Sequence, residues 1–245
     1  MDLPYDAQLL LAPTKRFRET IVFVHHFGGS QRTVLRHIKL ANTLGFDAVR
    51  FNLQFNELKL GQALPITSNL NFGASFVWRD QIEAILNAIP GRKILYSFSM
   101  PSLGALGAIS HRKASDINGW VCDGGPFLQL LRCTWNLLTH ESKIENLLQR
   151  AIYSGLAYFL FGGVEVAVPG WMQSLPAKFP VLSIRGEKDP LVPVSAIDDV
   201  LKMGPQIDLE KLSLPDGAHL DGLKRFPALY EAPVRAFLTR IGTPV

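Results

Sequence analysis

The sequence has few cysteines and no long basic run. Of its 245 residues only two are cysteines, Cys122 and Cys133, and neither belongs to a C-x-x-C pair or to a metal-ligand spacing. This count excludes a disulfide framework and favours two reduced, structural thiols. The net charge is +4, but no run of lysine and arginine exceeds two residues, so nucleic acid is not an expected partner.

The sequence also lacks an apolar stretch long enough to cross a membrane. The longest one, Ala151 to Val164, has about 14 residues, whereas a spanning helix needs about 20. The first residues include acids and an early proline, where a secretory signal peptide needs a positively charged segment. We therefore expect a cytoplasmic protein with no stable membrane insertion. Monomer and homodimer both stay open.

Strand-like apolar runs alternate with helical patterns along most of the chain. The runs lie at 21–25, 47–53, 93–98, 117–122, 181–184 and 209–214. This alternation predicts an α/β fold with a mostly parallel sheet and helices on both faces, with room before residue 20 for one or two edge strands. Ser30 is expected to cap a helix over 31–44.

One segment interrupts the alternation. From Phe127 to Gln173 the pattern is helical and strongly apolar, and no convincing strand falls within it. We therefore divide the chain into a core, 1–126 and 177–245, and a helical insertion, 127–176, that precedes the strand 181–184. Residues 54–74 are polar and asparagine-rich, and they are expected to form a loop.

A strand runs directly into a cluster of small residues and then into a helix. Ser99 lies at this corner, within Ser97-Phe98-Ser99-Met100-Pro101. The segment is the G-x-S-x-G pattern with both glycines replaced; in that pattern a strained backbone presents the serine hydroxyl. Pro101 is acceptable because the first turn of a helix tolerates proline. A rival frame centred on Ser102 puts Pro101 just before the nucleophile, so we prefer Ser99.

Other chemically functional side chains follow later strands. Asp123, Asp189 and His219 each come after a predicted strand, and the carboxyl ends of parallel strands meet at one edge of a sheet. Ser99, Asp189 and His219 follow one another in the chain order nucleophile, acid, base. Asp123 is an alternative acid, although we favour its interpretation as part of a turn-forming Asp-Gly-Gly.

These motifs resemble those of the α/β-hydrolase superfamily over about residues 19–241. The segment His25-His26-Phe27-Gly28-Gly29-Ser30 is similar to the family's H-G-x-G-G-S loop, with a histidine in place of the first glycine. Residues 185–193 resemble its G-x-x-D-x-x-V-P signature, and Gly217-Ala218-His219 resembles its histidine loop. The resemblance implies that the insertion 127–176 is a cap.

The resemblance also implies roles for individual residues. Ser99, Asp189 and His219 would form the catalytic triad, and the backbone N–H groups of Phe27 and Met100 would form the oxyanion hole. A serine in this position implies ester hydrolysis as the main reaction, and the resemblance implies no cofactor and no metal.

The insertion is rich in apolar side chains, which favours a pocket for a small-to-medium apolar ester. We expect His26, Trp135, Phe159 and Trp171 to line this pocket. Three alternatives stay open: a non-catalytic protein of the same fold that binds an apolar ligand, a lipase, thioesterase or carbon–carbon hydrolase with the same triad, and a protein that works at a membrane surface.

Overall fold

The structure, a computed structural model, describes residues 3–54, 73–112, 114, 116–161 and 163–245. The predicted loop over 54–74 therefore lies almost wholly outside the described residues.

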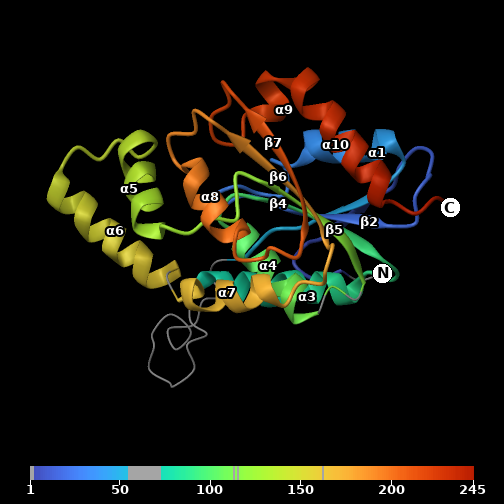
Figure 1. The fold of residues 1–245 in the computed structure, drawn as a ribbon, viewed down its shortest axis with the longest axis horizontal. Helices are drawn as coiled ribbons and strands as arrows, with labels where there is room; N and C mark the ends of the chain where they lie inside the picture. Colours follow the sequence, from blue (N-terminus) through green and yellow to red (C-terminus); the bar gives the residue numbers. More distant parts are fainter. Residues whose placement is uncertain (1–2, 55–72, 113, 115, 162) are drawn as a thin grey trace.

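The described strands form a seven-stranded sheet in the middle of the molecule (Figure 1). The strands are β1 (Gln8–Leu10), β2 (Thr20–Val24), β3 (Asp47–Arg50), β4 (Lys93–Phe98), β5 (Ile117–Asp123), β6 (Pro180–Gly186) and β7 (Asp208–Leu214). Their spatial order is β1-β3-β2-β4-β5-β6-β7, with β1 antiparallel to β3 and the other pairings parallel. The predicted mostly parallel sheet is confirmed, as is an edge strand before residue 20.

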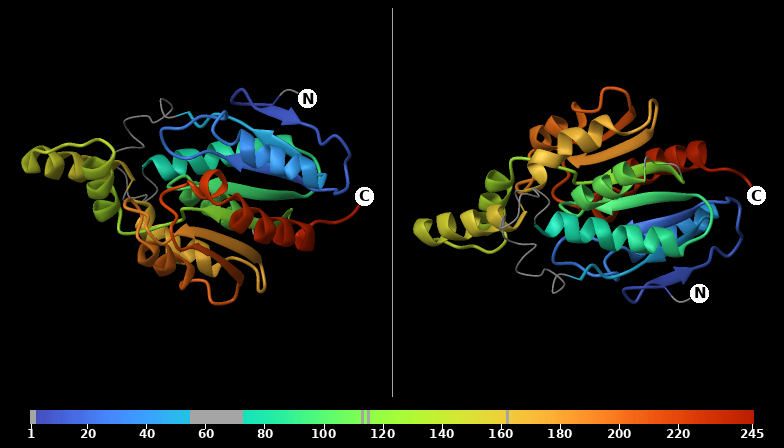
Figure 2. Two further views of the ribbon diagram at one scale, coloured as in Figure 1. Left: turned by 90° about the horizontal axis from the view of Figure 1, so that it is seen from above. Right: turned by 90° about the horizontal axis from the view of Figure 1, so that it is seen from below.

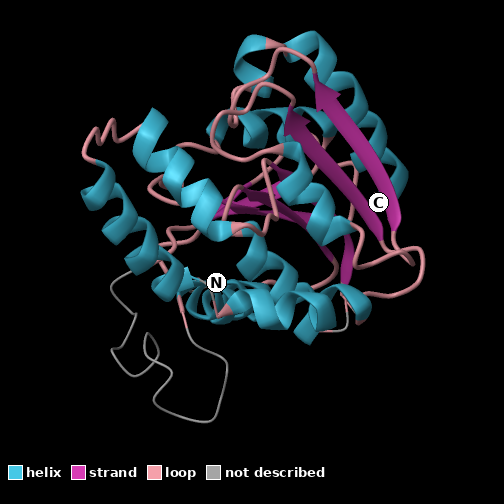
Figure 3. Cartoon of the chain, turned by 60° about the vertical axis from the view of Figure 1, so that its left-hand side comes forward, coloured by secondary structure: helices cyan, strands magenta, loops and turns pink. Residues whose placement is uncertain are grey.

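Helices cover both faces of the sheet (Figures 2 and 3). They are α1 (Leu35–Leu44), α3 (Ala74–Ala88), α4 (Ser102–His111), α5 (Leu130–His140), α6 (Leu147–Phe161), α7 (Val164–Gln173), α8 (Val194–Leu201), α9 (Gly222–Arg225) and α10 (Pro227–Ile241).

The two faces of β2 show how the core is divided. Side chains alternate between the faces of a strand, and all five residues of β2 are buried. Val22 and Val24 belong to the core formed with α3, α4, α7 and α8, whereas Ile21 and Phe23 belong to the core formed with α1 and α10. A strand that is apolar at four of its five positions is thus buried on both sides, as expected for a parallel sheet.

Ser30 does not cap α1, so the prediction of a helix from residue 31 was wrong. The residue before α1 is Val34, which makes no side-chain capping hydrogen bond. The Ser30 carbonyl oxygen instead accepts hydrogen bonds from the N–H and the hydroxyl of Thr33, at 2.9 and 2.7 Å. These local bonds form a turn, and the helix starts only after it.

Three helices lie between β5 and β6. Helix α7 packs along α4, whereas α5 and α6 contact each other and extend away from the sheet (Figures 1 and 2). We call residues 130–161 the α5–α6 hairpin. The division of the chain into a core and a cap stays a prediction. Among the described residues no single helix is long and apolar enough to cross a membrane, although α6 and α7, bent by 45° to each other, meet those criteria as a pair.

Candidate active site

Ser99 occupies a sharp turn between β4 and α4. Its backbone has a φ of 54°, in the left-handed region that a residue with a Cβ adopts only under strain. Hydrogen bonds on both sides hold this conformation: the Ser99 N–H donates to the carbonyl oxygen of Asp123 at 2.8 Å, and its own carbonyl accepts from the Ser102 N–H at 3.0 Å. Hydrogen bonds with β5 and with the first turn of α4 thus stabilise the strained backbone conformation of Ser99.

Pro101 fits the start of α4. It has helical backbone angles, φ −58° and ψ −13°, and its carbonyl oxygen accepts the N–H of Ala105 at 3.0 Å. Because proline has no N–H, it leaves no unsatisfied donor at this position. The second replaced glycine of the serine motif therefore causes no break in the helix.

Ser102, the rival nucleophile, faces the sheet. Its hydroxyl is fully buried and accepts a hydrogen bond from the Ser97 hydroxyl at 2.9 Å, while Ser97 accepts one from the Trp120 indole N–H at 2.8 Å. Ser97, the first replaced glycine position, is therefore part of a satisfied polar group behind the turn. The structure separates Ser102 from the cavity described below.

Gly125 allows the chain to pass close to Ser99. A Cβ atom at this glycine would collide with the Ser99 carbonyl oxygen and would lie 3.1 Å from the Ser102 hydroxyl oxygen. The loop after β5 can therefore support the serine turn only if this position has no side chain.

His219 connects Ser99 to Asp189. The Ser99 Oγ and the His219 Nε2 are 2.9 Å apart, and the His219 Nδ1 is 2.6 Å from the Asp189 Oδ2. The other carboxylate oxygen, Oδ1, accepts the N–H groups of Leu191 and Val192 at 2.8 and 3.0 Å. Since a carboxylate accepts, Nδ1 carries the proton and Nε2 is left to accept from the serine.

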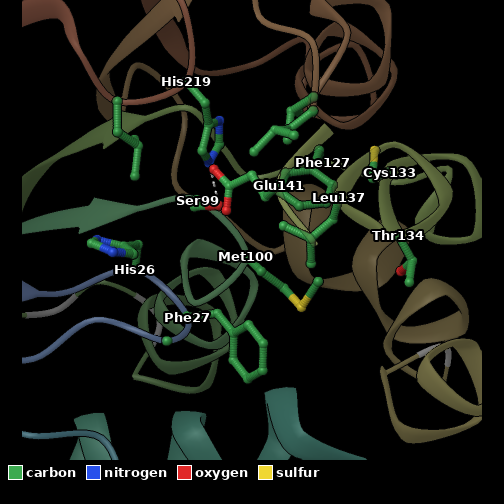
Figure 4. Close-up of a pocket in the computed structure, with 14 residues that line it drawn as sticks. His26, Phe27, Ser99, Met100, Phe127, Cys133, Thr134, Leu137, Glu141 and His219 are labelled. Carbon is green, nitrogen blue, oxygen red and sulfur yellow. Dashed lines mark hydrogen bonds between the residues drawn. The ribbon is translucent and has the colours of Figure 1, made fainter. Parts of the chain in front are cut away.

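A cavity of about 400 Å³ opens over this hydrogen-bonded group (Figure 4). It is bounded by the loop after β2, the serine turn, α5 and the loops that follow β6 and β7. Its described lining residues are His26, Phe27, Gly28, Ser99, Met100, Phe127, Cys133, Thr134, Leu137, Glu141, Leu191, Val192, His219 and Leu220. No cluster of three or more potential metal ligands occurs among the described residues.

His25 fixes the loop that carries Phe27. Its Nε2 accepts the N–H of Leu53 at 3.1 Å, so its Nδ1 must be the protonated nitrogen that donates to the His26 carbonyl oxygen at 2.8 Å. Burial lowers the pKa of His25, which favours this neutral form. A neutral histidine thus ties the loop to the chain that follows β3.

His26, which replaces the first glycine of the loop motif, lines the cavity as predicted. Its ring lies against the backbone of Gly29, where a Cβ atom would come within 2.8 Å of it. Burial lowers the pKa of His26, and the nearby His25 and His219 rings lower it further. The cavity wall therefore presents His26 as a neutral imidazole.

Asp123, the alternative acid, is bound elsewhere. Its Oδ2 accepts the hydroxyl of Tyr230 at 2.7 Å, and the Tyr230 hydroxyl is 2.5 Å from that of Tyr96. Burial raises the pKa of Asp123 to about 6. Asp189, not Asp123, forms the hydrogen bond to His219, in agreement with the preferred assignment.

Three of the four aromatic residues predicted to line the pocket lie elsewhere. The Trp135 ring is covered by the guanidinium of Arg150, 5.0 Å from its centroid, and the Trp171 ring packs edge-on against Phe76 at 5.3 Å. Phe159 lies on α6 with 44% of its surface exposed. The prediction failed for these three because an apolar helix does not reveal which of its faces points toward the sheet.

Comparison with known proteins adds the fold relationship. No family model and no curated protein matches the chain. Solved structures do match over nearly the whole chain. An esterase of Pyrococcus furiosus is 18% identical, with 97% of this chain and 86% of that chain covered and a TM-score of 0.64. A carboxyl esterase of Bacillus coagulans is 17% identical, with coverage of 96% and 93% and a TM-score of 0.66.

A monoacylglycerol lipase of Paleococcus ferrophilus is 14% identical, with 98% of this chain and 100% of that chain covered and a TM-score of 0.64. These matches cover nearly the whole chain, including the seven-stranded, mostly parallel sheet. The chain has the α/β-hydrolase fold. At this level of identity the comparison concerns the fold alone.

Within this α/β-hydrolase fold, sequence reasoning missed the contribution of α5 to the cavity. Cys133, Thr134, Leu137 and Glu141 follow one another at spacings of one, three and four residues, which places them on one side of the helix. That spacing was the available signal. It could not be used because the orientation of α5 depends on tertiary packing.

Proposed function

We propose that the protein is a serine hydrolase, a carboxylesterase that cleaves a small-to-medium apolar ester through an acyl-enzyme. The observation that carries the proposal is the hydrogen-bonded series Ser99–His219–Asp189 beneath an accessible cavity. A hydroxyl next to an imidazole acceptor that is oriented by a carboxylate is the arrangement that makes serine nucleophilic at neutral pH.

In the first half of the reaction the Ser99 Oγ attacks the ester carbonyl carbon while His219 Nε2 takes the hydroxyl proton. The negative charge moves onto the carbonyl oxygen, where the N–H groups of Phe27 and Met100 stabilise it. The tetrahedral intermediate collapses as His219 returns the proton to the departing alkoxide. The acyl group stays on Ser99, and the alcohol leaves.

In the second half, water replaces the alcohol. His219 takes a proton from the water as it attacks the acyl carbonyl, and then returns the proton to Ser99 as the carboxylic acid is released. Asp189 stabilises the imidazolium that forms in each half. The side chains of Phe127, Leu137, Leu191 and Leu220 give the cavity apolar walls for the acyl chain, and α5 acts as part of the cap.

A fluorophosphonate probe tests this function. We expect the probe to label the wild-type protein and not Ser99→Ala, while Ser102→Ala, which changes a hydroxyl outside the cavity, remains labelled. Ser99→Ala should reduce kcat/KM for p-nitrophenyl esters by about 10⁴-fold or more. A folded wild-type protein that reacts with no probe and no ester would instead support the non-catalytic binding protein.

Acyl-chain length tests the substrate class. The cavity volume of about 400 Å³ and its apolar walls support faster hydrolysis of p-nitrophenyl butyrate and hexanoate than of the acetate. A preference for the acetate would contradict an apolar acyl site. Cleavage of only thioesters or long-chain glycerides would favour the related alternatives with the same triad.

A further inference from the structure

Glu141 differs from every other described residue that lines the cavity. It is the one acidic side chain among them, and they include no lysine and no arginine. It comes from the end of α5 and lines the cavity together with Ser99 and His219, and in the view of Figure 4 its side chain is drawn across these two residues. The proposed mechanism gives this carboxylate no task.

The position of Glu141 on its helix adds to the negative electrostatic potential around its carboxylate. Glu141 follows the last residue of α5, and its N–H donates to the carbonyl oxygen of Leu137. The C-terminal end of a helix carries partial negative charge, so a carboxylate there is unfavourable for the helix. Carbonyl groups and carboxylate together make this part of the cavity attractive to a cation.

The two arginines of the α5–α6 hairpin are engaged elsewhere, and Lys143 is exposed and forms none of the ion pairs of the described residues. The Arg150 guanidinium donates to the Ile144 carbonyl oxygen and lies over the Trp135 ring, and Arg132 donates to the Gln129 side chain at 3.1 Å. The ion pairs of the described residues include none to Glu141. Glu141 is thus an exposed carboxylate at the border of a largely apolar cavity, with no ion pair to a described residue.

We propose that Glu141 forms a cation subsite, so that the preferred substrate is an ester whose apolar body carries an ammonium group. The proposal rests on the function proposed above and names its substrate class. The exposed ring of Phe27 and the ring of Phe127 line the same cavity, and aromatic faces accept organic cations at low desolvation cost. Apolar walls would hold the hydrocarbon part while Glu141 pairs with the charge.

Two competitors of equal length, n-hexylammonium and 1-hexanol, test the subsite. Each is measured as an inhibitor of the hydrolysis of neutral p-nitrophenyl butyrate, and by calorimetry as a ligand of Ser99→Ala, which needs no turnover. At low salt we expect the ammonium ion to bind about fivefold more tightly than the alcohol. This preference should shrink at 0.5 M NaCl, because salt screens an accessible ion pair.

The matched variants are Glu141→Gln and Glu145→Gln. Both glutamates are exposed residues of the same hairpin, but Glu145 does not line the cavity. Glu141→Gln should abolish the preference for the ammonium ion, and Glu145→Gln should retain it. Two results would overturn the proposal: equal binding of both competitors to the wild type, or a preference for the ammonium ion that survives Glu141→Gln. Either result would show that Glu141 is a solvated surface residue that binds no cation in the cavity.

The calorimetric arm separates this proposal from the proposed function. A cation preference in Ser99→Ala that depends on Glu141, with no ester hydrolysed by the wild type, would support the subsite and contradict the hydrolase. Hydrolysis of neutral esters with no Glu141-dependent preference would support the hydrolase and contradict the subsite.

Discussion

The serine turn and the α5–α6 hairpin border the same cavity, but they are packed in opposite ways. All six residues of β4 and nine residues of α4 are buried, and the turn between them is braced from β5. In α6 only Ser154 and Phe161 are buried, whereas Leu147, Leu148 and Leu156 expose 66, 71 and 58% of their surfaces.

This difference shows what each region can do. A strained φ at Ser99 persists because many buried contacts determine it, and strain of this kind requires rigid surroundings. The hairpin has few buried contacts, so its local opening should need less free energy than global unfolding. The nucleophile is therefore held on the rigid side of the cavity, and Glu141 lies on the side that can adjust to a ligand.

The same glycine-to-alanine change should have opposite effects in the two regions. Gly125→Ala puts a Cβ against the Ser99 carbonyl oxygen, and we expect a loss of about 3 kcal/mol or more of unfolding free energy, with reduced kcat. Gly155→Ala, in the middle of α6, meets no atom within 4 Å and should stabilise the protein by about 0.5–1 kcal/mol. Denaturant unfolding of both variants measures the contrast, and a similar loss in both would contradict it.

Truncating a leucine should separate the regions in the same way. Leu103 in α4 is fully buried, so Leu103→Ala should cost about 3 kcal/mol through lost contacts and a cavity. Leu148→Ala, at an exposed site of α6, should change the unfolding free energy by less than about 0.5 kcal/mol. A large cost for Leu148→Ala in solution would mean that something covers the hairpin there, for instance a second copy of the chain.

Sequence reasoning succeeded best where local pattern and tertiary structure agree. The bounds of β4 were predicted at 93–98, and the Ser99 turn followed from a strand that stops at small residues. Asp189 and His219 were predicted to lie near Ser99 because all three follow parallel strands, and the structure brings their polar atoms within hydrogen-bond distance. Their catalytic roles remain the proposal made above.

Sequence reasoning failed where the answer depends on the orientation of an apolar helix. Trp135 and Trp171 were expected in the pocket, but neighbouring helices cover their rings. Nothing in an apolar segment tells one buried face from another, because hydrophobic burial has no direction. The contribution of Glu141 to the cavity was missed for the same reason, since a charged residue at the end of a helix ordinarily faces solvent.

The last comparison concerns the buried carboxyl beside the serine turn and gives the smallest expected difference between the two regions. Burial raises the pKa of Asp123 from 3.8 to about 6, so the folded protein binds this proton more tightly than the unfolded chain does. The stabilisation from the protonated carboxyl is therefore complete below about pH 4 and is lost as the pH rises through 6. Asp123→Asn removes this dependence.

We therefore expect the unfolding free energy of Asp123→Asn, relative to wild type, to rise by about 2–3 kcal/mol between pH 4 and pH 7. Denaturant titrations across this range measure the difference. Leu148→Ala is the control from the hairpin, because it changes no ionisable group and should give a difference independent of pH. If the difference in unfolding free energy between Asp123→Asn and wild type does not change with pH, the prediction is wrong. The hydrogen bond that the Tyr230 hydroxyl donates to the Asp123 carboxylate would then stabilise the charged form enough to offset the cost of burying it.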